Sequence, residues 1–326
     1  MIKIITSEMV FSDGLFAPVQ YPAYVIDDFL SQEECNLLIS DSTNFLTSIT
    51  NVSKIHGGRV MLPWTSLEFN SLLNLSSSWS KLSQGFPYAV FRLLKSLQHN
   101  SEMFPDVEIS RYLSNGRIFP FSRYTLSSRL LALMSTSNNR ATIQARTISS
   151  FSSLGLFKVF CLRALDDIWR YSLSIFEKLM HIRSLIPLFD YSFSTQGYTR
   201  EIHRDSDSRL FVVLLYLNSM ESESIGGNLE LYNINNPVNN SCTSSQQSYP
   251  PQPDPSICEL QCVVHPRAGR LVVFANQHNS YHAVSEMKHS ILGRHFIYGG
   301  FTLPNSCFVD RQRFYNSKLP TELHLY

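Results

Sequence analysis

A histidine and an aspartate two residues apart, His203 and Asp205, are the residues whose types and spacing most directly indicate chemistry. They stand just before the apolar segment Leu210–Leu217, which predicts a strand. In an extended chain residues i and i+2 project from the same face, so the imidazole and the carboxylate can bind one cation together. A second histidine from elsewhere in the fold would complete a set of two histidines and one carboxylate, which leaves positions open on Fe(II).

Three histidines late in the chain could supply the missing ligand, namely His278, His282 and His289. We favour His282, because it lies in the context Ser-Tyr-His-Ala-Val, a short turn after a predicted strand that ends at Phe274. A His-x-Asp tripeptide alone is a weak signal, and its plain interpretation is a polar loop that enters a strand. Later in the chain Arg294 opens another apolar run, and its guanidinium could bind a carboxylate through two hydrogen bonds.

Other cations and polar residues compete for these roles. Arg267 and Arg270 are alternatives to Arg294, but Arg270 follows the glycine of a tight turn and is expected to face solvent. Arg209 and Asp207 are expected to anchor the loop after His-x-Asp rather than to contact a substrate. The pair Gly226–Gly227 predicts a turn that requires positive φ.

The order of these parts resembles the Fe(II)/2-oxoglutarate dioxygenases, and in particular their prolyl 4-hydroxylase-like branch. The segment Tyr24–Cys35 resembles the opening of that branch. The parts that carry the later resemblance are, in order, His203-x-Asp205, a strand ending in Tyr216-Leu217-Asn218, Gly226–Gly227, Pro266–Phe274, His282 and Arg294. The resemblance covers residues 22–45 and 186–303, and the residues between these blocks do not share it.

The resemblance implies a set of cofactors and the residues that bind them. It implies Fe(II) bound by His203, Asp205 and His282, with 2-oxoglutarate and O₂ as cosubstrates and ascorbate as an optional reductant. It also implies that Arg294 meets the far carboxylate of 2-oxoglutarate and that Tyr216 and Tyr198 offer hydroxyl groups to it. In one respect the chain departs from the family, because the tyrosine on the strand before His-x-Asp is replaced by Phe193 or displaced to Tyr191.

The expected reaction is hydroxylation of a protein side chain or a small molecule, with release of succinate and CO₂. Family members that halogenate lack the carboxylate ligand, so the presence of Asp205 favours hydroxylation. Two other classes stay open. One is a non-catalytic jelly-roll or cupin-like metal-binding module, and the other is a hydrolase or isomerase that uses the same ligands with Zn²⁺.

The pattern of the chain predicts an α+β protein with a double-stranded β-helix, a jelly-roll variant, as its catalytic core. Early elements are a strand within Tyr21–Phe29, an amphipathic helix capped by Ser31, and helices between residues 64 and 97. The apolar positions of Leu165–Leu185 follow a helical period, and Pro187 is expected to end that helix. Strands are expected at Leu188–Phe193, Leu210–Leu217, Asn228–Tyr232, Leu260–Val264, Gly269–Phe274, Ser280–Val284 and Arg294–Thr302.

Composition divides the chain into three parts, with supporting elements in residues 1–108, a basic Ser-rich insertion in 109–165 and the catalytic core in 166–326. A low-complexity loop at 233–257 interrupts the core. The insertion contains no Asp or Glu, and three interpretations stay open. It is a basic arm for an acidic partner or nucleic acid, a poorly ordered insertion with short helices at Ser127–Met134 and Leu156–Leu165, or retained non-coding sequence.

Composition also limits the functional classes. The 326 residues are 44% hydrophobic, enough for a globular enzyme core, and the formal net charge of +1 argues against a dedicated nucleic-acid-binding protein. No apolar run is long enough for a membrane span, and Glu8 comes too early for a secretory signal. The six cysteines are scattered and are expected to be free thiols, so we expect a cytoplasmic protein. We expect its substrate to be a protein or a small molecule.

Overall fold

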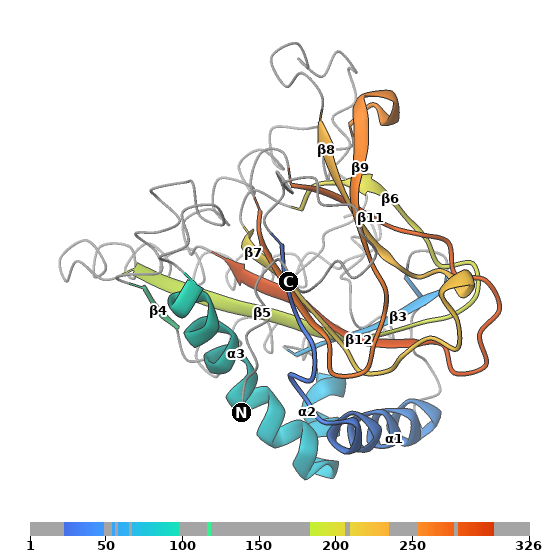
Figure 1. Cartoon of the computed structure of the whole chain (residues 1–326). Helices are drawn as coiled ribbons and strands as arrows, with labels where there is room; N and C mark the ends of the chain where they lie inside the picture. The colour runs from blue at the N-terminus through green and yellow to red at the C-terminus, as the bar shows by residue number, and fades with distance from the viewer. Residues whose placement is uncertain are drawn as a thin grey trace, which may run out of the picture.

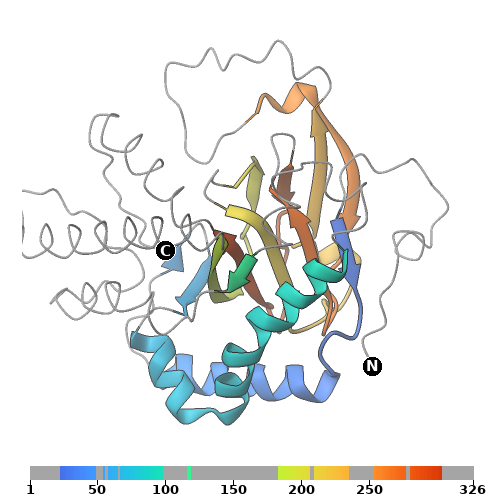
Figure 2. The same cartoon turned by 90° about the vertical axis from the view of Figure 1, so that its left-hand side faces the viewer.

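The computed structural model describes residues 23–48, 54–55, 58–64, 67–97, 116–118, 183–205, 209–234, 253–276 and 280–302 of the chain. These residues form α-helices and two β-sheets, as Figures 1 and 2 show from two sides. The α-helices are α1 (Gln32–Ser48), α2 (Leu67–Leu75) and α3 (Ser77–Leu97). Two short 3₁₀ helices are η3 (Glu223–Ile225) and η5 (Pro255–Ile257).

The large sheet has the strand order β1-β10-β7-β12-β5-β3-β2, and β4 pairs in parallel with β5. Its strands are β1 (Ala23–Ile26), β2 (Lys54–Ile55), β3 (Arg59–Pro63), β4 (Gly116–Ile118), β5 (Arg183–Ser194), β7 (Arg209–Tyr216), β10 (Leu271–Ala275) and β12 (Arg294–Thr302). The small sheet has the order β6-β11-β8-β9. Its strands are β6 (Arg200–His203), β8 (Leu229–Ile234), β9 (Cys258–Val264) and β11 (Tyr281–Val284).

The two sheets face each other across a buried apolar layer. Alternation along a strand places every second side chain on the inner face. The large sheet contributes Val25, Val212, Leu214, Tyr216, Val272, Phe274 and Phe296, and the small sheet contributes Leu229, Leu231, Cys262 and Val264. This is a double-stranded β-helix with helices outside it, so the predicted α+β fold class is confirmed.

The three helices cover the outer face of the large sheet (Figure 1). Their apolar side chains meet those of β5, β7 and β12 in a second core that is rich in aromatic rings. Phe189 of β5 lies at its centre, with ring centroids 5.2 Å from Trp64 and 5.1 Å from Phe86. Offset or edge-on aromatic pairs of this kind add to the stability that burial alone provides. The large sheet therefore separates a structural core from the inner layer.

The start of α1 follows the predicted capping pattern. The Ser31 hydroxyl accepts a hydrogen bond from the Glu34 amide at 3.2 Å, and the Glu34 carboxylate accepts one from the Ser31 amide at 2.8 Å. This reciprocal pair satisfies two amide groups that the first helical turn leaves without partners. Cys35 and Leu38 are buried as expected, whereas Leu37 is 54% exposed and does not belong to the apolar face.

A chain of buried polar groups connects the helices to β5 and β12. The Trp79 indole donates a hydrogen bond to the Ser42 hydroxyl at 2.8 Å, and Ser42 also bonds to the Tyr191 side chain. The Tyr191 hydroxyl lies 2.7 Å from Nδ1 of His295. Burial lowers the pKa of His295 to about 4, although a hydrogen bond to the Leu292 backbone opposes this shift. His295 is therefore neutral in the folded protein at neutral pH.

We predict that His295 makes the fold sensitive to mild acid. Its pKa is lower in the folded state than the ordinary value of 6.5, so the stability it contributes is present above pH 6.5 and is lost as pH falls towards about 4. The loss amounts to about 3 kcal/mol at most. Denaturant unfolding of the chelator-treated protein at several pH values should show this slope, and His295→Gln should show a shallower one. Equal slopes for the two proteins would contradict the prediction.

The later strands lie close to where the sequence predicts them. The predicted strands from Leu210 onwards correspond to β7, β8, β9, β10, β11 and β12. Four strands were not predicted, namely β2, β3, β4 and β6. The omission of β6 matters for the site, because His203 is its last residue and not part of a loop.

The predicted helix over Leu165–Leu185 is wrong at its C-terminal end. Residues 183–185 begin β5, and Pro187 lies inside this strand, where it is paired with Phe301 of β12. Long-range pairing of β5 with β12, β3 and β4 overrides the local helical period here. Residues 165–182 of that prediction lie outside the described residues.

Other predictions also fall outside the described part of the chain. These include the helices at Ser127–Met134 and Leu156–Leu165 and residues 235–252 of the low-complexity loop. Within the basic segment 109–165 only β4 is described. The three-part division of the chain thus stays a prediction. Among the described helices, none is both long and apolar enough to cross a membrane.

Candidate metal and cosubstrate site

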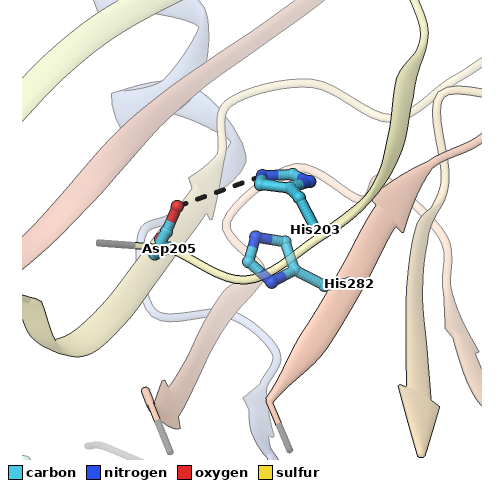
Figure 3. A group of neighbouring side chains, drawn as sticks. All are labelled: His203, Asp205 and His282. Atoms are coloured by element: carbon cyan, nitrogen blue, oxygen red, sulfur yellow. Dashed lines mark ion pairs between the residues drawn. The ribbon is translucent and has the colours of Figure 1, made fainter. Parts of the chain in front are cut away.

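His203, Asp205 and His282 come together at the open end of the small sheet (Figure 3). His203 ends β6 and lies directly opposite His282 of β11 in the antiparallel register. The two imidazole rings have centroids 4.4 Å apart, and Asp205 follows just after β6. One potential ligand atom from each residue lies within 4.8 Å of the others, so the three side chains could hold one metal ion. The structure thus brings together the three residues selected from the sequence.

Backbone carbonyl groups orient both imidazoles. Nδ1 of His203 lies 2.7 Å from the Glu201 carbonyl, and Nδ1 of His282 lies 3.3 Å from the Ser280 carbonyl. A carbonyl accepts only, so each Nδ1 donates and each Nε2 keeps a lone pair for a metal ion. Burial, followed by the charge of His282, lowers the pKa of His203 to about 3, and burial also lowers the pKa of His282. Both rings are therefore neutral, as metal ligands must be.

Asp205 is held as an ionised carboxylate. Arg209 donates a hydrogen bond to Oδ2 at 3.0 Å, and the Tyr298 hydroxyl lies 2.7 Å from each carboxylate oxygen. Burial alone would raise the pKa of Asp205, but Arg209 and the two histidines lower it below its usual value. Arg209 thus pairs with Asp205 itself. The role of Arg209 and Asp207 in anchoring the loop after the ligand pair stays a prediction, because residues 206–208 lie outside the described residues. Two neutral imidazoles and one carboxylate form a donor set suited to Fe(II).

Arg294 is the first residue of β12 and is buried, with 1% of its surface exposed. Its guanidinium lies over the rings of Tyr216 and Phe296, at 5.1 Å and 4.3 Å, and Nη2 is 3.4 Å from the Tyr216 hydroxyl. Nε and Nη1 are buried and make no hydrogen bond within the described structure. Burying an uncompensated charge is costly. The side chain therefore fits a ligand that brings a carboxylate, such as 2-oxoglutarate.

The competing residues are engaged elsewhere. Arg270 donates to both carboxylate oxygens of Asp27, at 2.6 Å and 3.0 Å, and Arg267 donates to the same carboxylate at 3.2 Å. The expectation that Arg270 faces solvent is wrong, because this ion pair fixes it between the β9–β10 turn and the residues after β1. His289 is exposed and does not join the metal-binding group, and His278 lies outside the described residues.

The tyrosines named from the sequence occupy different places. Tyr216 lies beside Arg294, while Tyr198 is buried against Val284 and Met287 and interacts electrostatically with Tyr216. Tyr191 points to the helices and bonds to His295, and Phe193 packs on the His295 ring at 4.5 Å. Neither residue of β5 therefore replaces the family tyrosine on the inner face.

Two residues of the inner wall, Tyr298 and Arg59, were not predicted from the sequence. Tyr298 contacts Asp205, and Arg59 lies over the rings of Phe296 and Tyr298. A signal for Tyr298 was available, because residues four apart on a strand share a face and Arg294 is on β12. No comparable signal marks Arg59, since β3 was itself not predicted.

The glycine pair before β8 makes room for Arg294. Gly226 and Gly227 have φ values of 84° and 72°, so the predicted turn with positive φ is confirmed. A Cβ atom on Gly227 would lie 2.9 Å from Cγ of Met287 and 3.2 Å from Cδ of Arg294. Gly227 is thus required both for its backbone conformation and for the close approach of the arginine stem.

We predict that Gly227→Ala destabilises the protein, by about 1–3 kcal/mol, through strain and the displaced Met287 and Arg294 side chains. Gly85→Ala is the matched control, because Gly85 lies within α3 and a Cβ atom there would meet nothing within 4 Å. The control should stabilise the helix by about 0.5–1 kcal/mol. Denaturant unfolding measures both effects, and equal unfolding free energies would disprove the packing argument.

Comparisons with known proteins agree with this site. Residues 189–299 match the family model of the 2OG-Fe(II) oxygenase superfamily. No curated protein matches the sequence.

Solved structures that resemble the chain include three prolyl hydroxylases. A prolyl-4-hydroxylase from Pseudomonas putida has 12% identity and a TM-score of 0.36, with 87% of this chain and 93% of that chain covered. A prolyl hydroxylase from Trichoplax adhaerens, in complex with a hypoxia inducible factor peptide fragment, has 14% identity and a TM-score of 0.41, covering 88% and 86%. A prolyl 4-hydroxylase from Phytophthora capsici has 11% identity and a TM-score of 0.38, covering 87% and 60%.

The match over residues 189–299 begins within β5 and ends within β12. It therefore contains the His203, Asp205 and His282 group and Arg294, whose donor types suit the Fe(II), 2-oxoglutarate and O₂ that this superfamily uses. The candidate site thus lies within the segment of the chain that is similar to the 2OG-Fe(II) oxygenase superfamily.

Proposed function

We propose that the protein is an Fe(II)- and 2-oxoglutarate-dependent hydroxylase of the prolyl 4-hydroxylase-like type, acting on a protein side chain or a small molecule. His203, Asp205 and His282 bind the metal, and Arg294 binds the far carboxylate of 2-oxoglutarate. The observation that supports this most is the buried Arg294 guanidinium, which has no carboxylate partner in the described structure. Neither a zinc hydrolase nor a non-catalytic metal-binding module requires a buried cation to bind the carboxylate of a cosubstrate.

Each residue has a distinct task in this proposal. Fe(II) with bound 2-oxoglutarate and O₂ supplies oxidative decarboxylation to succinate and CO₂, coupled to oxygen insertion into a C–H bond. The Glu201 and Ser280 carbonyl groups keep Nε2 of both histidines available, and Arg209 keeps Asp205 ionised. Arg294 and Tyr216 orient the cosubstrate, and Tyr198 is buried against Val284 and Met287. The carboxylate ligand occupies a position that a halide would need, which favours hydroxylation.

We predict that Asp205→Ala abolishes turnover and sharply weakens Fe(II) binding, because it removes the one anionic metal ligand. Metal affinity and iron content, measured by titration and elemental analysis, provide the test. His289→Ala is the control, since His289 is exposed and is not a member of the metal-binding group, and it should bind iron like the unmodified protein. Normal iron content in Asp205→Ala would remove the proposed ligand set.

We predict that Arg294→Ala raises the 2-oxoglutarate requirement by at least about thirtyfold. A carboxylate left unpaired in a desolvated site costs about 2–5 kcal/mol, and each 1.4 kcal/mol corresponds to about tenfold. Arg294→Lys should recover only part of the affinity, because lysine keeps the charge and loses the two parallel hydrogen bonds. Iron affinity should hardly change in either variant.

The measurement is succinate formation as a function of 2-oxoglutarate concentration in the three proteins. An unchanged requirement in Arg294→Ala would move the carboxylate site to another residue. If the iron-loaded unmodified protein does not respond to 2-oxoglutarate, the chain is a metal-binding module and not a dioxygenase. Turnover without O₂ would point instead to hydrolytic or isomerase chemistry.

A further inference from the structure

Tyr298 occupies an unusual position relative to the proposed metal ligand Asp205. Tyr298 is on β12, on the same inner face as Arg294 and Phe296. Its hydroxyl oxygen lies 2.7 Å from Oδ1 and 2.7 Å from Oδ2 of Asp205. A group that is equally close to both oxygens stands where a metal ion would stand if the carboxylate chelated it with both oxygens.

The tyrosine ring is held in this position by charged neighbours. The Arg59 guanidinium lies over the ring with 5.2 Å to its centroid, and the Arg209 guanidinium lies over it at 4.9 Å. Contacts of this kind are attractive and are stronger when water is excluded. Arg59 is itself fixed, because it donates to Asp190 at 2.8 Å and to the Ser192 hydroxyl at 2.9 Å and 2.7 Å. The hydroxyl is thus placed by the large sheet and not by the metal ligands.

The remaining contacts of Asp205 show which oxygen faces the metal. Arg209 donates to Oδ2 at 3.0 Å. Oδ1 is the oxygen that lies 4.0 Å from Nε2 of His203. With Tyr298 equally close to the two oxygens and Arg209 on Oδ2, Oδ1 is the oxygen best placed to share a metal ion with the imidazoles.

We propose that Tyr298 is a positioning residue that restricts Asp205 to one-oxygen metal coordination. This inference rests on the proposed function. An octahedral ion with three protein ligand atoms keeps three positions open, and 2-oxoglutarate needs two of them while O₂ needs the third. A carboxylate that chelated with both oxygens would take one of these positions. Tyr298 therefore keeps all three open coordination positions available to the cosubstrates, without being a metal ligand itself.

The test uses the full-length protein loaded with Mn(II), whose bound waters are counted by water proton relaxation. In Tyr298→Phe the ring and its contacts with both guanidiniums remain, but the chelating position becomes free. We expect one bound water fewer than in the unmodified protein. We also expect the Kd for 2-oxoglutarate, measured by the loss of relaxation on titration, to rise about tenfold, which corresponds to about 1.4 kcal/mol.

Tyr232→Phe is the matched control. The Tyr232 hydroxyl also bonds to a carboxylate at 2.7 Å, that of Glu230, but this pair lies outside the metal-binding group. The control should keep both the number of bound waters and the Kd. An unchanged or larger number of waters in Tyr298→Phe would overturn the inference, since a larger number means that Asp205 has left the metal.

A second variant tests the inference independently, including the case in which Tyr298→Phe does not fold. Tyr298→Met also removes the hydroxyl and fills the space with an apolar side chain, so it should lose one bound water as Tyr298→Phe does. An unchanged number of waters in Tyr298→Met would overturn the inference. If 2-oxoglutarate displaces no water from the unmodified Mn(II) protein, the proposed function itself fails; if it does and Tyr298→Phe behaves identically, only the positioning role fails.

Discussion

A positive charge that is buried without a counter-charge among the described residues is the constraint on which the rest of the structure depends. The Arg294 guanidinium contacts aromatic rings and one hydroxyl, and two of its nitrogen atoms have no hydrogen-bond partner in the described structure. The strand that carries it, β12, lies between β5 and β7 in the large sheet and is paired on both sides. The fold must therefore be stable enough to hold this buried charge.

The metal-binding group also buries a charge, but there a neighbouring residue of opposite charge compensates it. Its two imidazoles are neutral because burial lowers their pKa values, so the negative charge resides on Asp205 alone. Arg209 compensates that charge in the absence of metal. The two halves of the site thus carry opposite local charge, with the anionic ligand on the loop after β6 and the uncompensated cation on β12.

The sequence predicts the residues of the site more completely than the strands and helices around them. The ligands His203, Asp205 and His282 could be selected because two-residue spacing and apolar context are local properties, and the structure places them together. The contact between Tyr298 and Asp205 depends on how the two sheets face each other, which no local pattern contains. The start of β5 was mistaken for a helix for the same reason, since its pairing partners lie on β12, β3 and β4.

The alternation of side chains along β12 has a consequence for how the chain can change in evolution. Arg294 and Tyr298 point to the inner layer, whereas the neighbouring His295 and Ile297 belong to the helix-covered side. Loss or gain of a single residue within this strand would exchange the two sets, because the side-chain period of a strand is two. The side chains of Ile291 and Leu292 just before the strand are exposed and belong to neither set. The restriction on chain length that alternation imposes therefore begins at Arg294, the first residue of β12.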